Sequence, residues 1–188
     1  MDSSWRFDRC SGSRPGTSVR ACSNGGETVE EPTAATALAS DEGEALWFGD
    51  FLLVVKTPAE RTGERFSVLE QTAAKGAATP WHAHPEDDET MYVVEGELTF
   101  YLEDAEPFEV RAGSTVHIPG GAKHAFRVNS ETARFVDVTT AQHENFLREA
   151  AVPAAERTVP PDTEPDVARM QAAAQRHKVE ILGPPPVA

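Results

Sequence analysis

Short apolar runs separated by turn-forming residues are the feature of this sequence that most limits its fold. Such runs occupy residues 46–48, 51–56, 66–70, 91–94, 98–102, 108–110, 115–118, 125–128 and 135–138. Runs of this length, bounded by Gly, Pro, Asp or Asn, are typical of β-strands. No segment between them repeats its apolar residues at the helical period. The region therefore predicts an all-β sandwich or barrel.

The two ends of the chain differ from this middle region. Residues 1–35 are rich in Ser, Gly, Arg, Thr and Pro without apolar periodicity, which predicts a disordered or poorly ordered extension. Cys10 and Cys22 both lie there, apart from any expected core or site. We expect residues 36–140 to form the barrel and residues 141–188 to form a tail of short helices and proline-rich segments that packs on it.

The charge balance argues against several classes of partner. The chain has 31 acidic and 17 basic residues and a formal net charge of −14, which disfavours nonspecific binding to nucleic acid and to anionic membrane surfaces. No apolar run reaches the roughly 18 residues of a membrane span, and the start of the chain lacks the apolar stretch of a secretory signal. We therefore expect a cytoplasmic protein with a small-molecule substrate.

Three histidines and one glutamate have the spacing of metal ligands. His82 and His84 are two residues apart on a predicted strand, so their imidazoles should point to the same face. Glu89 follows after an acidic turn, and His124 lies farther along the chain. Fe, Mn, Ni, Co, Cu and Zn all accept such ligands. The set predicts one divalent transition metal ion with coordination positions left open for catalysis.

Two motifs containing these residues resemble those of the cupins. The first is Gly76-x5-His82-x-His84-x4-Glu89-x6-Gly96, and the second is Gly113-x5-Pro119-x-Gly121-x2-His124. The resemblance covers about residues 43–140, and its finer features are similar to small single-domain, quercetin-dioxygenase-like bacterial cupins. It implies a double-stranded β-helix, or jelly-roll, barrel that holds one metal ion through His82, His84, Glu89 and His124. It also implies a homodimer.

The resemblance further implies an activity. In quercetinase-like enzymes the ligand carboxylate also takes the proton of the flavonol hydroxyl before dioxygen cleaves the heterocycle, and Glu89 matches that catalytic position. We therefore expect a metal-dependent dioxygenase acting on a small aromatic or enolisable substrate. Two alternatives remain open, because a fold does not determine a function. One is a redox-neutral isomerase or cyclase that uses the metal as a Lewis acid, and the other is a non-catalytic small-molecule-binding cupin.

Strand alternation predicts which side chains surround the metal. Met91 should share the face of Glu89, Phe126 should share the face of His124, and Phe100 should point inward with the apolar residues of its own strand. These three residues are expected either to fill the barrel or to line a mostly apolar substrate cavity.

The remaining polar residues near the motifs have simpler expected roles. His117 is a candidate for a residue that contacts a metal ligand without binding the metal itself, whereas His143 and His177 are expected on the surface. Glu86, Asp87 and Asp88 are expected to form a solvated turn.

Overall fold

The computed structural model describes residues 35–161 and 166–186. The extension predicted for residues 1–35 lies, apart from its last residue, outside this range, and so do Cys10 and Cys22. In the part of the chain that the structure describes, no helix has the length and apolar character needed to cross a membrane.

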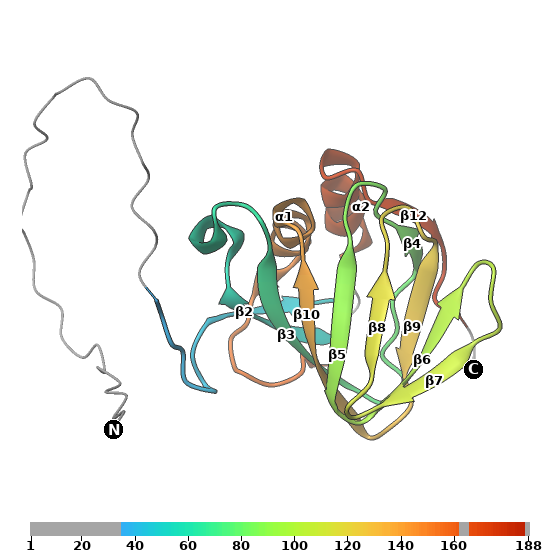
Figure 1. Ribbon diagram of the computed structural model, residues 1–188, viewed down its shortest axis with the longest axis horizontal. Helices are drawn as coiled ribbons and strands as arrows, with labels where there is room; N and C mark the ends of the chain where they lie inside the picture. The colour runs from blue at the N-terminus through green and yellow to red at the C-terminus, as the bar shows by residue number, and fades with distance from the viewer. Residues whose placement is uncertain (1–34, 162–165, 187–188) are drawn as a thin grey trace, which may run out of the picture. The chain divides into compact units, whose positions relative to one another are not determined.

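Two antiparallel sheets face each other and form a barrel (Figure 1). The first sheet has the order β11 (Val152–Pro153), β1 (Glu44–Phe48), β2 (Phe51–Thr57), β3 (Ser67–Ala74), β10 (Thr132–Thr139), β5 (Glu89–Glu95), β8 (Thr115–Ile118). The second has the order β12 (Glu180–Gly183), β4 (Trp81–Ala83), β9 (His124–Val128), β6 (Glu97–Leu102), β7 (Phe108–Arg111). This arrangement confirms the predicted all-β jelly-roll barrel.

The barrel core follows the predicted strand alternation. On β5, Met91 and Val93 are buried, whereas Tyr92 between them is 48% exposed. The rings of Phe51, Phe100 and Phe126 lie between the sheets, and the Phe126 centroid is 5.7 Å from that of Phe51 and 5.5 Å from that of Phe100. Packed aromatic rings at such distances are a main source of core stability.

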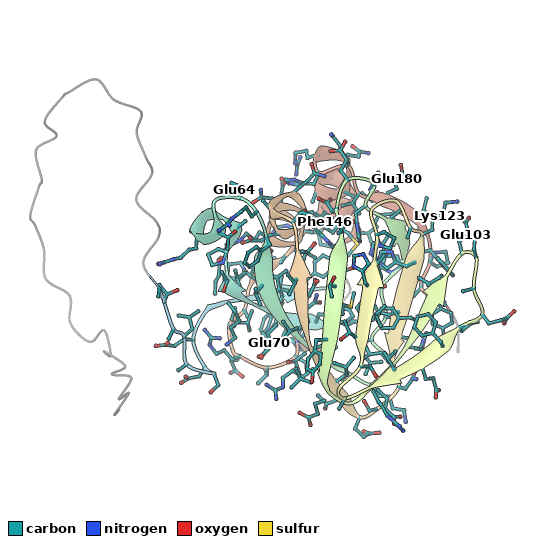
Figure 2. All side chains as sticks on the ribbon, in the orientation of Figure 1. Glu64, Glu70, Glu103, Lys123, Phe146 and Glu180 are labelled. Atoms are coloured by element: carbon teal, nitrogen blue, oxygen red, sulfur yellow. The ribbon has the colours of Figure 1, made fainter. Side chains whose placement is uncertain are left out.

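Two helices cover one end of the barrel (Figure 1). Helix α1 (Ala141–Ala150) begins where the Thr140 side chain accepts a hydrogen bond from the His143 backbone N–H, the usual way of satisfying a free helical donor. Helix α2 (Val167–Arg176) packs on α1, and a third, one-turn helix η1 spans Ala59–Thr62. The two α-helices and the first sheet enclose a second hydrophobic core, and Phe146 of α1 is buried in it (Figure 2).

The C-terminal segment also extends the sheets themselves. Strand β12 pairs with β4 and places Ile181 opposite His82, while β11 pairs with β1. The segment after residue 140 therefore contributes two strands as well as two helices. The pairing of β12 with β4 positions residues 180–183 beside the histidine motif.

The turn between β5 and β6 requires glycine for a steric reason. Gly96 has a φ of 85°, and a Cβ atom at this position would lie 2.3 Å from the carbonyl oxygen of Thr132. Any side chain would therefore collide with the backbone of the neighbouring β10 segment. This close approach explains the last glycine of the first motif.

Candidate metal centre

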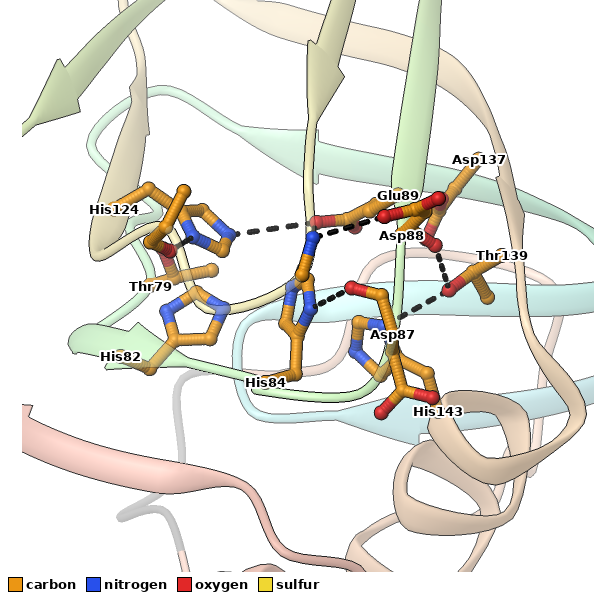
Figure 3. Close-up of polar contacts among 12 residues, drawn as sticks. Thr79, His82, His84, Asp87, Asp88, Glu89, His124, Asp137, Thr139 and His143 are labelled. Atoms are coloured by element: carbon orange, nitrogen blue, oxygen red, sulfur yellow. Dashed lines mark hydrogen bonds and ion pairs between the residues drawn. The ribbon is translucent and has the colours of Figure 1, made fainter.

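The four predicted ligands meet inside the barrel, between the two sheets (Figure 3). His82 lies on β4 opposite His124 on β9, Glu89 begins β5, and His84 follows directly after β4. The side chains of His84 and His124 are fully buried, and those of His82 and Glu89 are nearly so. The fold thus joins residues from one short stretch with a histidine from a distant strand.

Three buried polar atoms in this group have no hydrogen-bond partner. They are Nε2 of His84, Nε2 of His124 and Oε2 of Glu89. The carboxylate oxygen lies 3.4 Å from each of the two nitrogens, and the His82 and His124 ring centroids are 4.1 Å apart. Buried polar atoms without partners are rare in native proteins. Converging nitrogen and oxygen lone pairs fit a divalent transition metal ion.

Backbone carbonyl groups determine which nitrogen of each ligand histidine is free. Nδ1 of His82 lies 2.9 Å from the Pro80 carbonyl oxygen, and Nδ1 of His124 lies 2.9 Å from that of Ala122. Nδ1 of His84 lies 2.6 Å from the carbonyl oxygen of Asp87. A carbonyl oxygen only accepts hydrogen bonds, so each Nδ1 carries the proton. Each Nε2 then has its lone pair available for a metal.

The charges within the group also favour cation binding. Burial would raise the pKa of Glu89, but the adjacent His124 and His84 side chains outweigh burial and hold this pKa well below its usual value. Burial, together with the charge of His124, lowers the pKa of His82 to about 3. At neutral pH the site therefore offers an ionised carboxylate and an unprotonated imidazole, which are the metal-binding forms of both groups.

His143 belongs to this site, so its expected position on the surface is wrong. It lies in the first turn of α1 and is only 3% exposed, and its ring centroid is 4.6 Å from that of His84, with the two rings tilted by 36°. Its Nδ1 is 3.1 Å from the hydroxyl oxygen of Thr139, which donates its own proton to the Asp88 carbonyl. Nδ1 of His143 must therefore be the donor in this contact. Its Nε2 is left as an acceptor, and the residue groups with His84 and Glu89 as a candidate metal-binding set.

The acidic turn before Glu89 is not entirely solvated, which corrects another expectation. Glu86 is exposed and bonds to Lys178, but Asp87 is 2% exposed. The Asp87 carboxylate accepts hydrogen bonds from the Thr140 hydroxyl and the Gln142 side-chain amide. These contacts attach the turn to the start of α1, and the same residue's carbonyl oxygen orients His84.

A second buried carboxyl group, Asp137 of β10, lies next to Glu89 and was not identified from the sequence. Burial and the nearby Glu89 carboxylate raise the pKa of Asp137 well above its usual value. Gln71 of β3 donates a hydrogen bond to it at 3.3 Å. The signal in the sequence was an acid in phase with the inward-facing Phe135. Asp137 is thus a second buried carboxyl group beside Glu89 whose neutral form is favoured by burial.

The remaining predicted residues separate into two groups. His117 is exposed on the outer face of β8 and hydrogen-bonds to Thr90. It therefore does not reach the ligands, because Ile118, which pairs with Glu89, takes the inward position. Met91 and Phe100 fill the core, and of the three proposed lining residues only Phe126 borders the cavity described next.

A small cavity of about 40 Å³ adjoins the candidate ligands. Its polar lining is Gln71, Thr79, His82, Glu89 and His143, and its apolar lining includes Phe126, Phe146 and Met170. A cavity of this size holds a few water molecules, since one water needs roughly 10–15 Å³. Glu89, His82 and His143 border it, and each of them has an acceptor atom that the hydrogen-bond pattern leaves free.

Part of this barrel matches a known protein family. Residues 69–139 match the family model of the cupin domain. The match runs from β3 to β10 and contains all four predicted ligands, but His143 and both α-helices lie outside it.

Two curated proteins of Bacillus subtilis are similar in sequence. Quercetin 2,3-dioxygenase is 30% identical over 114 residues, which cover 60% of this chain and 34% of the dioxygenase. The uncharacterized protein YdbB is 40% identical over 47 residues, which cover 25% of this chain and 42% of YdbB. The chain thus matches about a third of the length of the dioxygenase and less than half of that of YdbB.

Two solved structures share the fold. A predicted oxalate decarboxylase from Thermotoga maritima superposes with a TM-score of 0.52 at 16% identity, over 56% of this chain and 98% of that one. KdgF from Halomonas sp. superposes with a TM-score of 0.51 at 16% identity, over 57% of this chain and 94% of that one. At such low identity the likeness concerns the fold alone.

Proposed function

This chain carries a cupin domain at residues 69–139, and on that premise we propose that it is a mononuclear metal-dependent oxidoreductase of the quercetinase-like dioxygenase type. Its substrate would be a small aromatic or enolisable molecule. The observation that carries the proposal is the convergence of His84 Nε2, His124 Nε2 and Glu89 Oε2, all buried and without hydrogen-bond partners. The similarity to quercetin 2,3-dioxygenase supports the choice of reaction.

Each of the four ligands would have a defined task. His82, His84 and His124 would bind the metal through Nε2, oriented by the carbonyl groups that accept from their Nδ1 atoms. Glu89 would bind through Oε2. A divalent metal at this place supplies Lewis acidity that lowers the pKa of a coordinated hydroxyl group.

Proton removal from the substrate would fall to Glu89 and His143. Both face the small cavity, and a base must lie within hydrogen-bond reach of the proton that it takes. Glu89 is held in its ionised form by His124 and His84. Nε2 of His143 is an acceptor because its Nδ1 donates to Thr139. The deprotonated substrate would then be the electron-rich partner that reacts with dioxygen.

One observation favours a redox-neutral isomerase or cyclase as the second candidate. Two separate acceptors on one cavity, Glu89 and His143, suit a reaction in which one group removes a proton while another group returns one. Such an enzyme would use the same metal only as a Lewis acid. It would work without oxygen and with a redox-inert metal such as zinc.

Elemental analysis followed by oxygen measurements tests the proposal. The purified protein should contain close to stoichiometric divalent metal, and that metal form should consume oxygen with at least one flavonol or catechol. A dioxygenase places both oxygen atoms in its product, so uptake should equal substrate consumption without an added reductant. Turnover that continues under argon, or with zinc alone, would instead favour the redox-neutral candidate. The dioxygenase proposal fails if the metal form consumes no oxygen across the panel.

A further inference from the structure

A second, larger pocket lies outside the small cavity, at the mouth of the barrel. Its volume is about 310 Å³, and it is bordered by the turn between β1 and β2, by residues 78–80, by α2 and by the chain around β12. Five residues border both spaces: Phe48, Thr79, Pro80, Met170 and Ile181. The pocket and the metal-side cavity are therefore neighbours, and these side chains form the partition between them.

The C-terminal segment supplies one side of this partition. Met170 projects from α2, while Ile181 lies on β12 opposite His82. Both side chains are partly exposed, whereas Phe48 and Pro80 belong to the barrel side. Met170 has an unbranched, flexible side chain, whereas Ile181 is β-branched and stiff, so Met170 is the residue of the partition whose side chain can most readily change its rotamer.

The backbone that carries these two residues is anchored at several points. Arg169 of α2 donates a hydrogen bond to the Ala151 carbonyl at 2.6 Å, and Ala173 and Ala174 are buried against α1 and the first sheet. Arg127 of β9 donates to the carbonyl of Pro186. The outer pocket is thus bounded by a fixed segment of this chain that lies beyond the cupin-domain match at residues 69–139.

The lining of the pocket selects for uncharged, apolar ligands. Phe51, Val167, Met170, Ile181 and Pro184 provide apolar contacts. Asp50 is the one ionisable residue on its lining, and among the described residues no Lys or Arg borders either space. In the outer pocket an anionic group would therefore meet the Asp50 carboxylate and no basic side chain. The pocket volume reaches the lower end of the ~300–1,000 Å³ range of small-molecule sites, whereas the inner cavity is far below it.

We propose that the outer pocket, which Met170 and Ile181 share with the metal-side cavity, is the subsite for the ring portion of a neutral aromatic substrate. This inference rests on the proposed function only in assigning the bound molecule as a substrate. The ring would lie against Val167 and Phe51, and its oxygen substituent would point past Met170 towards Glu89 and His143. The same lining disfavours a phosphate or carboxylate group on the part of the substrate that lies in the outer pocket.

A binding experiment on the full-length protein tests the subsite separately from the chemistry. The probes are 2-naphthol, which is neutral at pH 7, and 6-hydroxynaphthalene-2-sulfonate, which has the same ring system with a fixed negative charge. Isothermal titration calorimetry under argon measures the binding of both probes in the absence of turnover. Wild-type protein should bind 2-naphthol at least tenfold more tightly than the sulfonate.

Two tryptophan variants on one helix locate the binding site. Val167 borders the pocket and is 54% exposed, so Val167→Trp should fill the pocket without disturbing the fold. Ala168 is exposed on the same helix but does not border the pocket, so Ala168→Trp is the matched control. We expect Val167→Trp to weaken 2-naphthol binding at least tenfold and Ala168→Trp to leave it unchanged. Equal affinities in the two variants would overturn the proposal.

A ligand variant separates this inference from the proposed function. Glu89→Gln removes the base and a metal ligand but leaves the outer pocket intact, so it should bind 2-naphthol within about threefold of wild type. Loss of binding in Glu89→Gln would place the ring at the metal centre and contradict the subsite. Retained binding together with absent oxygen uptake in the wild type would leave the subsite standing and remove the dioxygenase proposal.

Discussion

At the scale of single residues, the hydrogen bonds that the histidines donate determine which of their nitrogen atoms can bind a metal. The Nδ1 atoms of His82, His84 and His124 all donate to backbone carbonyl groups, and Nδ1 of His143 donates to a threonine hydroxyl. The four Nε2 atoms are therefore left as acceptors within one buried group that also contains Glu89. Such an arrangement is costly unless a cation or a bound ligand satisfies the acceptors.

Replacing Glu89 with glutamine should remove most of the bound metal. The variant keeps the size of the side chain but loses the charge that offsets the burial of a dication. Glu86→Gln is the matched control, because Glu86 lies in the same turn and bonds to Lys178 on the surface. Elemental analysis of freshly purified proteins should show a severalfold lower metal content for Glu89→Gln alone. Equal stoichiometry in the two variants would contradict the ligand assignment.

Replacing His143 with glutamine should flatten the pH dependence of stability in metal-free protein. Burial, which outweighs the attraction of Glu89, lowers the pKa of His143 from 6.5 to about 4. Between these values the unfolded chain binds a proton that the folded protein does not, so stability falls as the pH drops below 6.5. Between pH 7 and pH 5 this residue should account for a loss of about 2 kcal/mol.

Urea unfolding of both proteins in EDTA at these two pH values measures the effect of His143. The other titrating groups of the site are present in both proteins, so the difference between the two pH responses isolates His143. An identical loss of stability in wild type and His143→Gln would show that His143 is not held in its neutral form.

At the scale of secondary-structure elements, the prediction from sequence succeeded where local alternation decides the outcome. The inward positions of Met91, Phe100 and Phe126 follow from the two-residue period of strands, and all three are buried. Strand β12 is only four residues long, and its role depends on pairing with β4, which no local pattern encodes. His143 did leave a signal, since it lies three residues before Phe146 on the buried face of α1.

The β5–β6 turn offers a test at this scale. Gly96 and Gly113 have similar positive φ angles of 85° and 91°, but a Cβ atom on Gly96 would meet the Thr132 carbonyl, whereas a Cβ atom on Gly113 has no neighbour within 4 Å. Both alanine variants carry the left-handed backbone cost of roughly 1–2 kcal/mol. Gly96→Ala should lose about 2 kcal/mol or more beyond Gly113→Ala, because the clash is with backbone. Urea denaturation of the two variants tests this, and equal losses would show that the turn can relax.

At the scale of the whole molecule, residues of the candidate site come both from the segment that matches the cupin-domain model and from the segments on either side of it. The cupin-domain match at residues 69–139 contains the four predicted ligands. The parts outside it supply four further lining residues: Phe48 from β1, His143 from α1, Met170 from α2 and Ile181 from β12. The motifs therefore allowed the convergence of the four candidate ligands to be predicted from sequence. The pocket could not be predicted, because its walls come from segments that meet only in the folded chain.

Removal of a metal bound at the candidate site should destabilise the molecule as a whole, because such an ion would link the two sheets through His82 and His124 on one and Glu89 on the other. A ligand present at about 100 times its Kd and absent from the unfolded chain stabilises by about 2.7 kcal/mol. For a domain of this size that corresponds to roughly 5–10 °C in Tm. Thermal melts followed by circular dichroism should show this decrease with EDTA and its reversal when metal is restored.

Glu86→Gln should behave like wild type, whereas Glu89→Gln should melt at the same temperature with and without metal. A shift of equal size in Glu89→Gln would mean that the stabilising ion binds elsewhere on the protein.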